Sequence, residues 1–265
     1  MKSRPSVRPE SEDEQPRLAV LIDADNAQPA VIEGLLAEVA KYGVASVKRI
    51  YGDFTSTRMT QWKQALLKHS INPVQQFAYT SGKNATDSSL IIDAMDLMYT
   101  GRFDGVCLVS SDSDFTRLAQ RLREEGLTVY GFGERKTPDA FVQACDKFIY
   151  VEVLRSEASA PAAPPSPPKP AKKEAARPAA KKPAGQAEPT AAPAAESGRH
   201  ESLPLKLIRQ AIEEASDDQG WAFLGGVGSY LNKIRPDFDP RLYGHRKLSD
   251  LLKHQSRHFA IEERA

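Results

Sequence analysis

The sequence has little cysteine and no long apolar run. Its 265 residues include only Cys107 and Cys145, which are too few for a disulfide framework or a four-cysteine metal site. Both are expected to be small buried hydrophobic residues. No run approaches the roughly 18 apolar residues that span a membrane, and residues 1–17 lack the apolar core of a signal peptide. We therefore expect a cytoplasmic protein with a disordered leader at 1–17.

Excess charge of one sign is also missing. The formal net charge is +1, so the whole-chain charge does not indicate a polyanionic partner. Any nucleic-acid surface must come from local clusters of lysine and arginine. The apolar fraction of 40% is sufficient for one sizeable α/β domain and a second, smaller one.

A segment rich in proline, alanine and lysine divides the chain. Residues 155–201 contain runs such as "APAAPPSPPKPAKKEAARPAAKKPAG", in which proline interrupts each helical stretch and large apolar residues are absent. We expect a disordered, mildly basic linker between a domain at 18–154 and a domain at 202–265.

Short β-rich runs alternate with helical periods through the first domain. This alternation predicts an α/β fold, a doubly wound and mostly parallel sheet with helices on both faces. The expected strands are 18–23, 46–54, 72–79, 105–111, 128–133 and 147–153. The expected helices are 29–43, 57–70, 86–101, 113–126 and 138–145.

Acidic residues from three distant segments are predicted to meet at one edge of this sheet. Asp23 ends the first strand, and Asp112 and Asp114 follow the fourth. If these two strands are neighbours, the three carboxylates lie where the strand order reverses, which is where open parallel sheets bind ligands. Asp87 falls on the buried stripe of the third helix, in its first turn, and so points to the same edge.

Each aspartate taken alone has a simpler explanation. Asp87 and Asp114 could stabilise helix starts, and Asp25 or Asn26 could be ordinary turn residues. Asp93 and Asp96, on another side of the third helix, are interpreted as solvated charges or as charges flanking the buried stripe. Three distant segments each bring a carboxylate to one edge of the sheet, and such like charges repel one another unless they are neutralised. This convergence favours a bound divalent cation. Oxygen ligands without cysteine or paired histidine select Mg²⁺ or Mn²⁺.

Hydrolysis of a phosphodiester bond is the natural reaction of such a site. We expect the metal ligands to be Asp23 and Asp112 directly, with Asp87 and Asp114 completing the shell, and Asn26 to orient a water or phosphate. Three further side chains are candidates for phosphate contacts, namely Lys83, Ser110 and Ser111.

Three stretches of the first domain, "LAVLIDADNAQ", "GKNATDSSLIIDAMDLM" and "VCLVSSDSDFTRLAQRLREEGLTVYGFG", resemble the NYN domain, a PIN-like nuclease family that includes LabA-like proteins. The resemblance implies a PIN-like fold, a Mg²⁺ or Mn²⁺ site and RNA as substrate. It carries the family's acidic site onto Asp23, Asp87, Asp112 and Asp114, with Asn26 beside them. Asp25 is an addition with no assigned role. PIN-like domains often pair, so a homodimer is a further state to test.

The second domain is predicted to be a small winged-helix-like module. Helical patterns near 203–216, 224–236 and 245–255 precede a strand-like "HFAIEE" at 258–263. The third helix carries cations suited to phosphate contacts, namely Arg246, Lys247, Lys253 and Arg257. The segment from 200 to 263 resembles the OST-HTH domain, also called LOTUS, which implies RNA binding to single-stranded or structured RNA.

The leading hypothesis is therefore a metal-dependent endoribonuclease guided by a C-terminal RNA-binding domain. A noncatalytic RNA-binding regulator that keeps the acidic site is an alternative from another class. A haloacid-dehalogenase-like phosphatase with Asp23 as nucleophile is weaker, because Asn26 stands where that family has a hydroxyl or valine.

Overall fold

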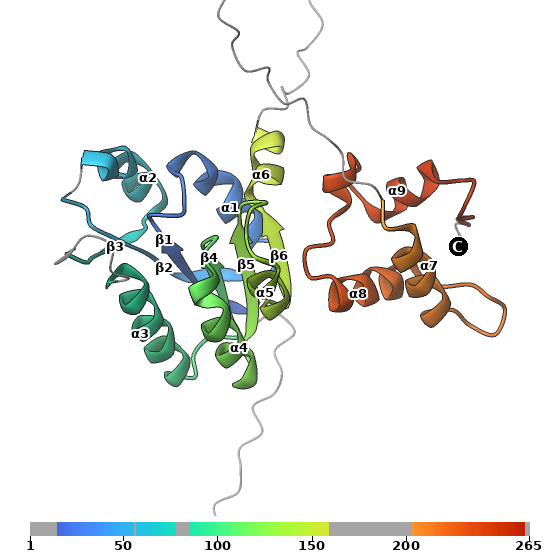
Figure 1. Ribbon diagram of the computed structural model, residues 1–265, viewed down its shortest axis with the longest axis horizontal. Coiled ribbons are helices and arrows are strands. Elements are labelled where there is room, and N and C mark those ends of the chain that lie inside the picture. Colours follow the sequence, from blue (N-terminus) through green and yellow to red (C-terminus); the bar gives the residue numbers. More distant parts are fainter. Residues whose placement is uncertain (1–14, 56, 78–84, 159–202, 263–265) are drawn as a thin grey trace, which may run out of the picture.

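The chain folds into an α/β domain and a smaller helical domain. The computed structural model describes residues 15–55, 57–77, 85–158 and 203–262. Figure 1 shows the sheet of the N-terminal domain between two layers of helices, with the C-terminal helices beside it. Within these ranges, no helix combines the length and apolar composition needed to cross a bilayer.

The sheet of the N-terminal domain is parallel throughout and doubly wound. Its spatial order is β3-β2-β1-β4-β5-β6, so the predicted neighbours β1 and β4 are confirmed, and the order reverses between them. In register, Leu18 of β1 faces Gly105 of β4, and Ile22 faces Val109. The strands are β1 (Arg17–Asp23), β2 (Val44–Gly52), β3 (Asn72–Gln75), β4 (Gly105–Val109), β5 (Thr128–Gly133) and β6 (Lys147–Tyr150).

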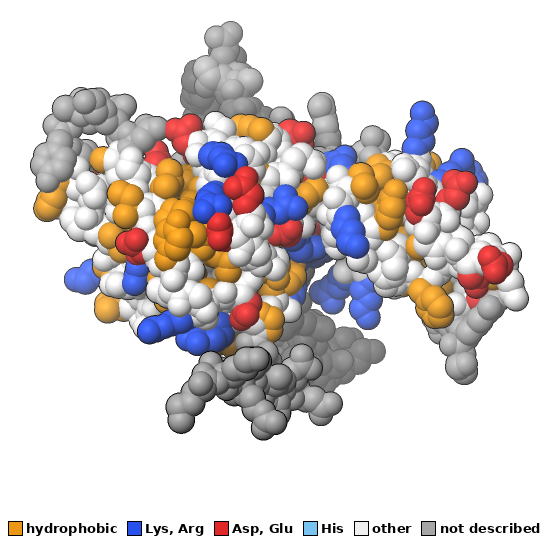
Figure 2. Space-filling view, turned by 90° about the horizontal axis from the view of Figure 1, so that it is seen from below, with side chains coloured by type: hydrophobic (Ala, Val, Ile, Leu, Met, Phe, Trp, Pro, Cys, Tyr) orange, Lys and Arg blue, Asp and Glu red, His pale blue; other side chains and the backbone are white. Residues whose placement is uncertain are grey.

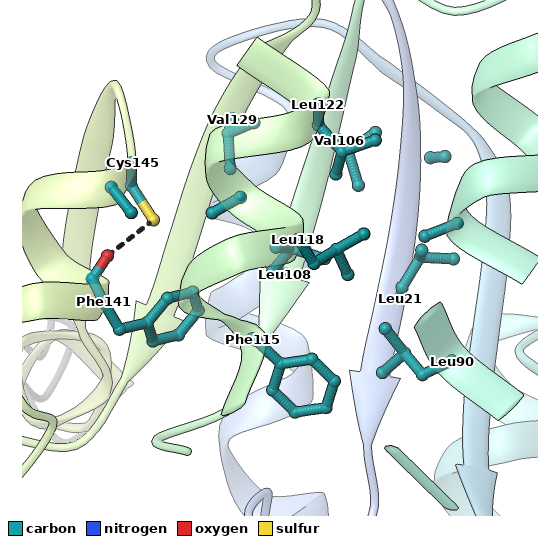
Figure 3. Packing of buried hydrophobic residues seen from close by; sticks show 14 of the residues in the cluster. Leu21, Leu90, Val106, Leu108, Phe115, Leu118, Leu122, Val129, Phe141 and Cys145 are labelled. Atoms are coloured by element: carbon teal, nitrogen blue, oxygen red, sulfur yellow. Dashed lines mark hydrogen bonds between the residues drawn. The ribbon is translucent and has the colours of Figure 1, made fainter. Parts of the chain in front are cut away.

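Helices cover both faces of the sheet because successive strand residues point to opposite sides. In β1, Leu21 packs with α3 (Ala85–Tyr99), α4 (Thr116–Glu124) and α5 (Asp139–Ala144). Figure 3 shows this layer, in which Leu21, Leu90 and Leu118 converge over the sheet. Ile22 packs on the other face with α1 (Ile32–Val39), α2 (Trp62–His69) and α6 (Val151–Ala158). Both cysteines are buried.

The last predicted strand of this domain is partly wrong. Residues 147–153 were expected to be extended, but β6 ends at Tyr150 and α6 begins at Val151. The neighbouring β5 ends at Gly133, which pairs with Tyr150, so no strand remains for residue 151 to join. Val151 and Leu154 are buried at a helical spacing of three. The helix runs to Ala158, beyond the expected start of the linker at 155.

The C-terminal domain is built around three helices. They are α7 (Leu205–Glu214), α8 (Leu224–Ile234) and α9 (Leu248–His254), with the short helix η4 (Pro240–Tyr243) between the last two. Ile208, Leu231 and Leu251 meet in its core. The predicted strand at 258–263 is wrong for residues 258–262, which form a turn and irregular backbone. Phe259 and Ile261 instead pack against the helical core.

Gly131 tests the packing of β5. A Cβ at this position would lie 2.7 Å from Cys145 Sγ and would also meet the Phe148 ring. Because both neighbours belong to the core, we expect Gly131→Ala to lower the free energy of unfolding by about 2 kcal/mol, measured by denaturant unfolding. Gly225→Ala in α8, where a Cβ meets nothing within 4 Å, is the control and should be neutral or stabilising. Equal stability of the two variants would contradict the packing.

Candidate metal centre

Three carboxylates meet where the strand order reverses. Asp112 and Asp114 follow β4 and flank the start of the short helix η3 (Ser113–Phe115), and Asp87 stands in the first turn of α3. One oxygen from each of the three lies within 4.8 Å of the others. The predicted convergence of these three residues therefore occurs in the structure.

Asp23 lies beneath this trio, at the end of β1. It is not among the three mutually close carboxylates, and it is fully buried, with 0% exposure. Its Oδ1 accepts the Asp25 N–H at 3.0 Å. Its Oδ2 accepts the Asn26 amide at 2.7 Å and the Ser110 hydroxyl at 2.8 Å. Both oxygens of Asp23 are thus engaged by the protein.

Ser110 was predicted to contact phosphate, and in the structure it connects Asp23 to the trio. Its hydroxyl donates to Asp23 and accepts the Asp112 N–H at 3.1 Å. Since a hydroxyl has one hydrogen to donate, Ser110 has none left for a phosphate. Ser111 is also buried, and its hydroxyl accepts the Glu134 N–H at 2.8 Å. Ser110 therefore shapes the loop after β4, whereas the acceptor role of Ser111 leaves its hydroxyl hydrogen able to donate.

The electrostatics of the site reflect crowded negative charge. Burial raises the pKa of Asp87 from 3.8 to about 6, and repulsion by neighbouring aspartates adds to this shift, from Asp23, Asp112, Asp114 and Asp25. Burial also raises the pKa of Asp23, although the hydrogen bonds from Asn26 and Ser110 oppose that shift. The negative charges at this edge therefore destabilise one another unless a proton or a cation is bound.

The donor set fits a hard divalent cation. All three close groups are carboxylates, which suit Mg²⁺ or Mn²⁺ better than zinc. Asp112 is held in place because its Oδ1 accepts the Asp114 N–H at 2.9 Å. Asp87, Asp112 and Asp114 are thus the residues that could hold such an ion.

Other predicted residues of the site have different outcomes. Lys83 lies outside the described residues. Asp25 is exposed. Its backbone N–H donates to the Asp23 carboxylate, so Asp25 helps to form the turn after β1. The amide nitrogen of Asn26 is used on Asp23, so its carbonyl oxygen is the part that can orient a water.

Sequence reasoning was wrong about Asp93. Of the two interpretations, a solvated or a flanking charge, the first is wrong, because the Asp93 carboxylate accepts from Arg49 and from the Tyr51 hydroxyl on β2. It therefore anchors α3 to the sheet, six residues after Asp87. The interaction depends on where β2 lies, and no local pattern in α3 reveals it. Asp96 is exposed, as expected.

Comparison with known families agrees with this geometry. The model of the NYN domain matches residues 17–153, the part of the chain that forms the sheet and the acidic trio. The chain belongs to the NYN family. A second match, to the OST-HTH/LOTUS domain, covers residues 202–265. The NYN domain here has the α/β fold expected of a PIN-like domain, and its family is one of nucleases.

Two solved structures are similar to parts of the chain. A protein of unknown function from Vibrio parahaemolyticus is 18% identical, with a TM-score of 0.43, over 52% of this chain and 94% of its own. An uncharacterized protein from Nitrosomonas europaea is 47% identical, with a TM-score of 0.22, over 27% of this chain and 68% of its own. No curated protein matches the chain.

The OST-HTH domain displays the predicted cations. Arg246, Lys247, Lys253 and Arg257 are all exposed. The rings of His245 and His254 lie 5.2 Å apart beside them. The view in Figure 2 shows that Lys and Arg side chains alternate with Asp and Glu over the NYN domain, which agrees with the balanced net charge.

The raised pKa of Asp87, caused by burial and by repulsion from neighbouring aspartates, predicts a pH-dependent effect in metal-free protein. Its folded-state pKa of about 6 exceeds the unfolded value, so the ionised group destabilises the fold progressively as pH rises from about 4, and fully above about 6. Asp87→Asn should therefore raise the free energy of unfolding near neutral pH by about 1 kcal/mol, after allowance for solvent screening.

Urea unfolding with a chelator present, at acid and neutral pH, measures this effect. The gain should disappear near pH 3, where the wild-type carboxyl is also neutral. Asp96→Asn, an exposed aspartate of the same helix, should change stability little at either pH. A loss of stability in Asp87→Asn at neutral pH would contradict the proposed repulsion.

Proposed function

We propose that this protein is a metal-dependent endoribonuclease, whose OST-HTH domain binds the RNA that the NYN domain cuts. The observation that carries the proposal is the trio Asp87, Asp112 and Asp114, whose oxygens lie within 4.8 Å of one another at the ligand-binding edge of the sheet. The nuclease family and the adjoining OST-HTH domain support RNA as the substrate.

In this proposal, Asp87, Asp112 and Asp114 hold Mg²⁺ or Mn²⁺. A bound ion of this kind polarises a phosphate oxygen and lowers the pKa of a coordinated water. The charge on the trio gives this site its affinity for a cation and repels the phosphate backbone when no cation is bound.

The remaining residues orient the trio. Asp23 holds Asn26 and Ser110, and Ser110 in turn holds the backbone of Asp112. The carbonyl oxygen of Asn26 is then available to direct an attacking water. We assign Asp23 this orienting role in place of the direct metal contact expected from the sequence, because its side chain is 0% exposed and bonds Asn26 and Ser110.

The burial of Asp23 opposes a phosphatase with an aspartate nucleophile. Such a group must reach the phosphorus atom, whereas the Asp23 side chain is 0% exposed and enclosed by Asn26 and Ser110. A noncatalytic RNA-binding regulator would keep the same carboxylates without turnover, so a cleavage assay separates it from the nuclease.

Asp112→Asn tests catalysis directly. Asparagine keeps the Oδ1 atom that accepts the Asp114 N–H, so the fold should persist while one negative charge is lost. We expect cleavage of end-labelled RNA in Mg²⁺ or Mn²⁺ to fall by about 100-fold or more, and a chelator to abolish wild-type cleavage. Asp96→Asn should retain wild-type activity. Equal cleavage by the Asp112 variant, or none by wild type over a varied RNA set, would reject the nuclease.

The cations of the OST-HTH domain should determine the salt dependence of RNA binding. Replacing Lys247, Lys253 and Arg257 with alanine should weaken binding and reduce the slope of log K against log salt by about two. The control is a triple alanine variant of three cations in surface ion pairs, namely Lys68, Arg117 and Arg121. Fluorescence anisotropy over a salt series measures both. If both variants have the same slope of log K against log salt, then Lys247, Lys253 and Arg257 do not contact RNA phosphates.

A further inference from the structure

A buried group of charges, far along the chain from the acidic trio, joins the two domains. Arg241 of the OST-HTH domain extends a two-pronged contact to Glu38 of α1, with Nη1 to Oε2 at 2.9 Å and Nη2 to Oε1 at 3.0 Å. Arg241 Nη2 also contacts Asp239 Oδ2 at 2.7 Å. The side chains of Glu38, Asp239 and Arg241 are only 3%, 11% and 13% exposed. We call these three residues the latch.

Together with Lys41, the latch residues are balanced in charge and hydrogen-bonded. Besides Arg241, the Glu38 carboxylate accepts from Lys41 at 2.7 Å and from the Tyr42 hydroxyl at 3.1 Å. Burial acts to raise the pKa of Glu38, but the hydrogen bonds from Arg241 and Lys41 outweigh it and lower the pKa to about 2. Glu38 is therefore ionised near neutral pH, and removing its partner would leave a buried charge uncompensated.

The OST-HTH segment 235–244 presents Arg241 in a fixed position. Asp239 caps η4 by accepting the Arg241 N–H at 2.9 Å, and the same carboxylate holds the guanidinium. After η4, Gly244 has a φ of 83°, a left-handed conformation that favours glycine. The arginine is thus oriented by its own loop before it meets Glu38.

Backbone and side-chain contacts continue the junction along β6, the edge strand of the sheet. The Phe148 N–H, which points away from β5, donates to the Pro236 carbonyl at 2.9 Å. Lys147 donates to Asn232 at 3.3 Å, and the Tyr150 hydroxyl donates to Asp237 at 3.2 Å. The OST-HTH domain therefore covers an edge that would otherwise expose unpaired backbone groups.

We propose that the latch docks the OST-HTH domain on the NYN domain in one orientation, and that this docking determines where along a bound RNA the acidic trio acts. The second part rests on the proposed ribonuclease function. Arg241 and Glu38 are then positioning residues, because they contact neither the trio nor its ligands.

The docked arrangement differs from free tethering through the segment 159–202. A flexible tether only raises the local concentration of one domain near the other, so a bound RNA could reach the trio at many positions. In the docked arrangement, α9 lies level with α6, the helix that continues from the carboxyl end of β6 (Figure 1). Between the domains, Lys41, Lys147 and Arg246 line a groove of about 280 Å³ together with the latch residues, so both domains contribute to the surface around the latch.

Solution scattering of the full-length chain tests the docking. Arg241→Ala removes the guanidinium group that bonds both oxygens of Glu38, and Glu38→Lys places a cation from the NYN domain against Arg241. Both variants should increase the radius of gyration and split one thermal unfolding transition into two. Arg117→Ala, which breaks an exposed ion pair with Glu124, should do neither.

Glu38→Lys keeps this test decisive if Arg241→Ala unfolds its own domain, because the substitution lies outside that domain. Wild-type scattering and a single transition in Glu38→Lys, with its folded state verified by circular dichroism, would overturn the docking.

Cleavage of two RNAs tests the positional consequence. On a long end-labelled RNA, wild type should cut within a narrow window, whereas both latch variants should cut over a wider range or about tenfold more slowly. On an RNA of about six nucleotides, too short to reach both domains, rates should be unchanged.

If variants that scattering shows to be undocked cut the long RNA in the same pattern as wild type, the positional role is wrong, while the docking proposal still stands. If wild type cuts neither RNA, the ribonuclease proposal and the positional role both fail, and scattering still decides the docking.

Discussion

Repulsion among carboxylates at the carboxyl ends of β1 and β4 is the constraint on which the rest of this structure depends. The order β3-β2-β1-β4-β5-β6 reverses between β1 and β4, the position where open parallel sheets bind ligands, and α3 brings Asp87 close to Asp112 and Asp114. This arrangement does not favour stability, since burial, together with repulsion by the neighbouring aspartates, raises the pKa of Asp87 to about 6. The destabilisation is understandable if it is relieved when a cation binds, which links the energetics of the apo fold to its function.

The parts of this design that follow local periodicity could be predicted from sequence. Apolar stripes identified the central strands, and the helical phase of Asp87 relative to Leu90 and Ala94 placed it on the buried side. The adjacency of β1 and β4 followed from the usual winding of parallel sheets. These features predicted the acidic edge before any distance was known.

Other features depend on contacts between distant segments, which periodicity does not encode. The sequence around Asp93 does not distinguish it from a solvated charge, yet its carboxylate bonds Arg49 and Tyr51. The position of Ser110 after a strand predicted a hydrogen bond to phosphate, but its hydroxyl donates to Asp23, 87 residues away. Glu38 offered one local signal, because it shares the buried stripe of α1 with Leu35 and Val39. Its partner Arg241 lies 203 residues away, beyond the reach of such patterns.

Two types of charge cluster thus coexist in one chain. In the latch, Arg241 and Lys41 balance the charges of Glu38 and Asp239 at a buried domain junction, whereas the trio brings three carboxylates together at a site partly open to solvent. Anomalous diffraction from a crystal soaked in Mn²⁺ tests this distinction most directly. The account predicts a peak about 2.1 Å from oxygens of Asp87, Asp112 and Asp114. A fully occupied peak elsewhere, or none at this edge at millimolar Mn²⁺, would contradict it.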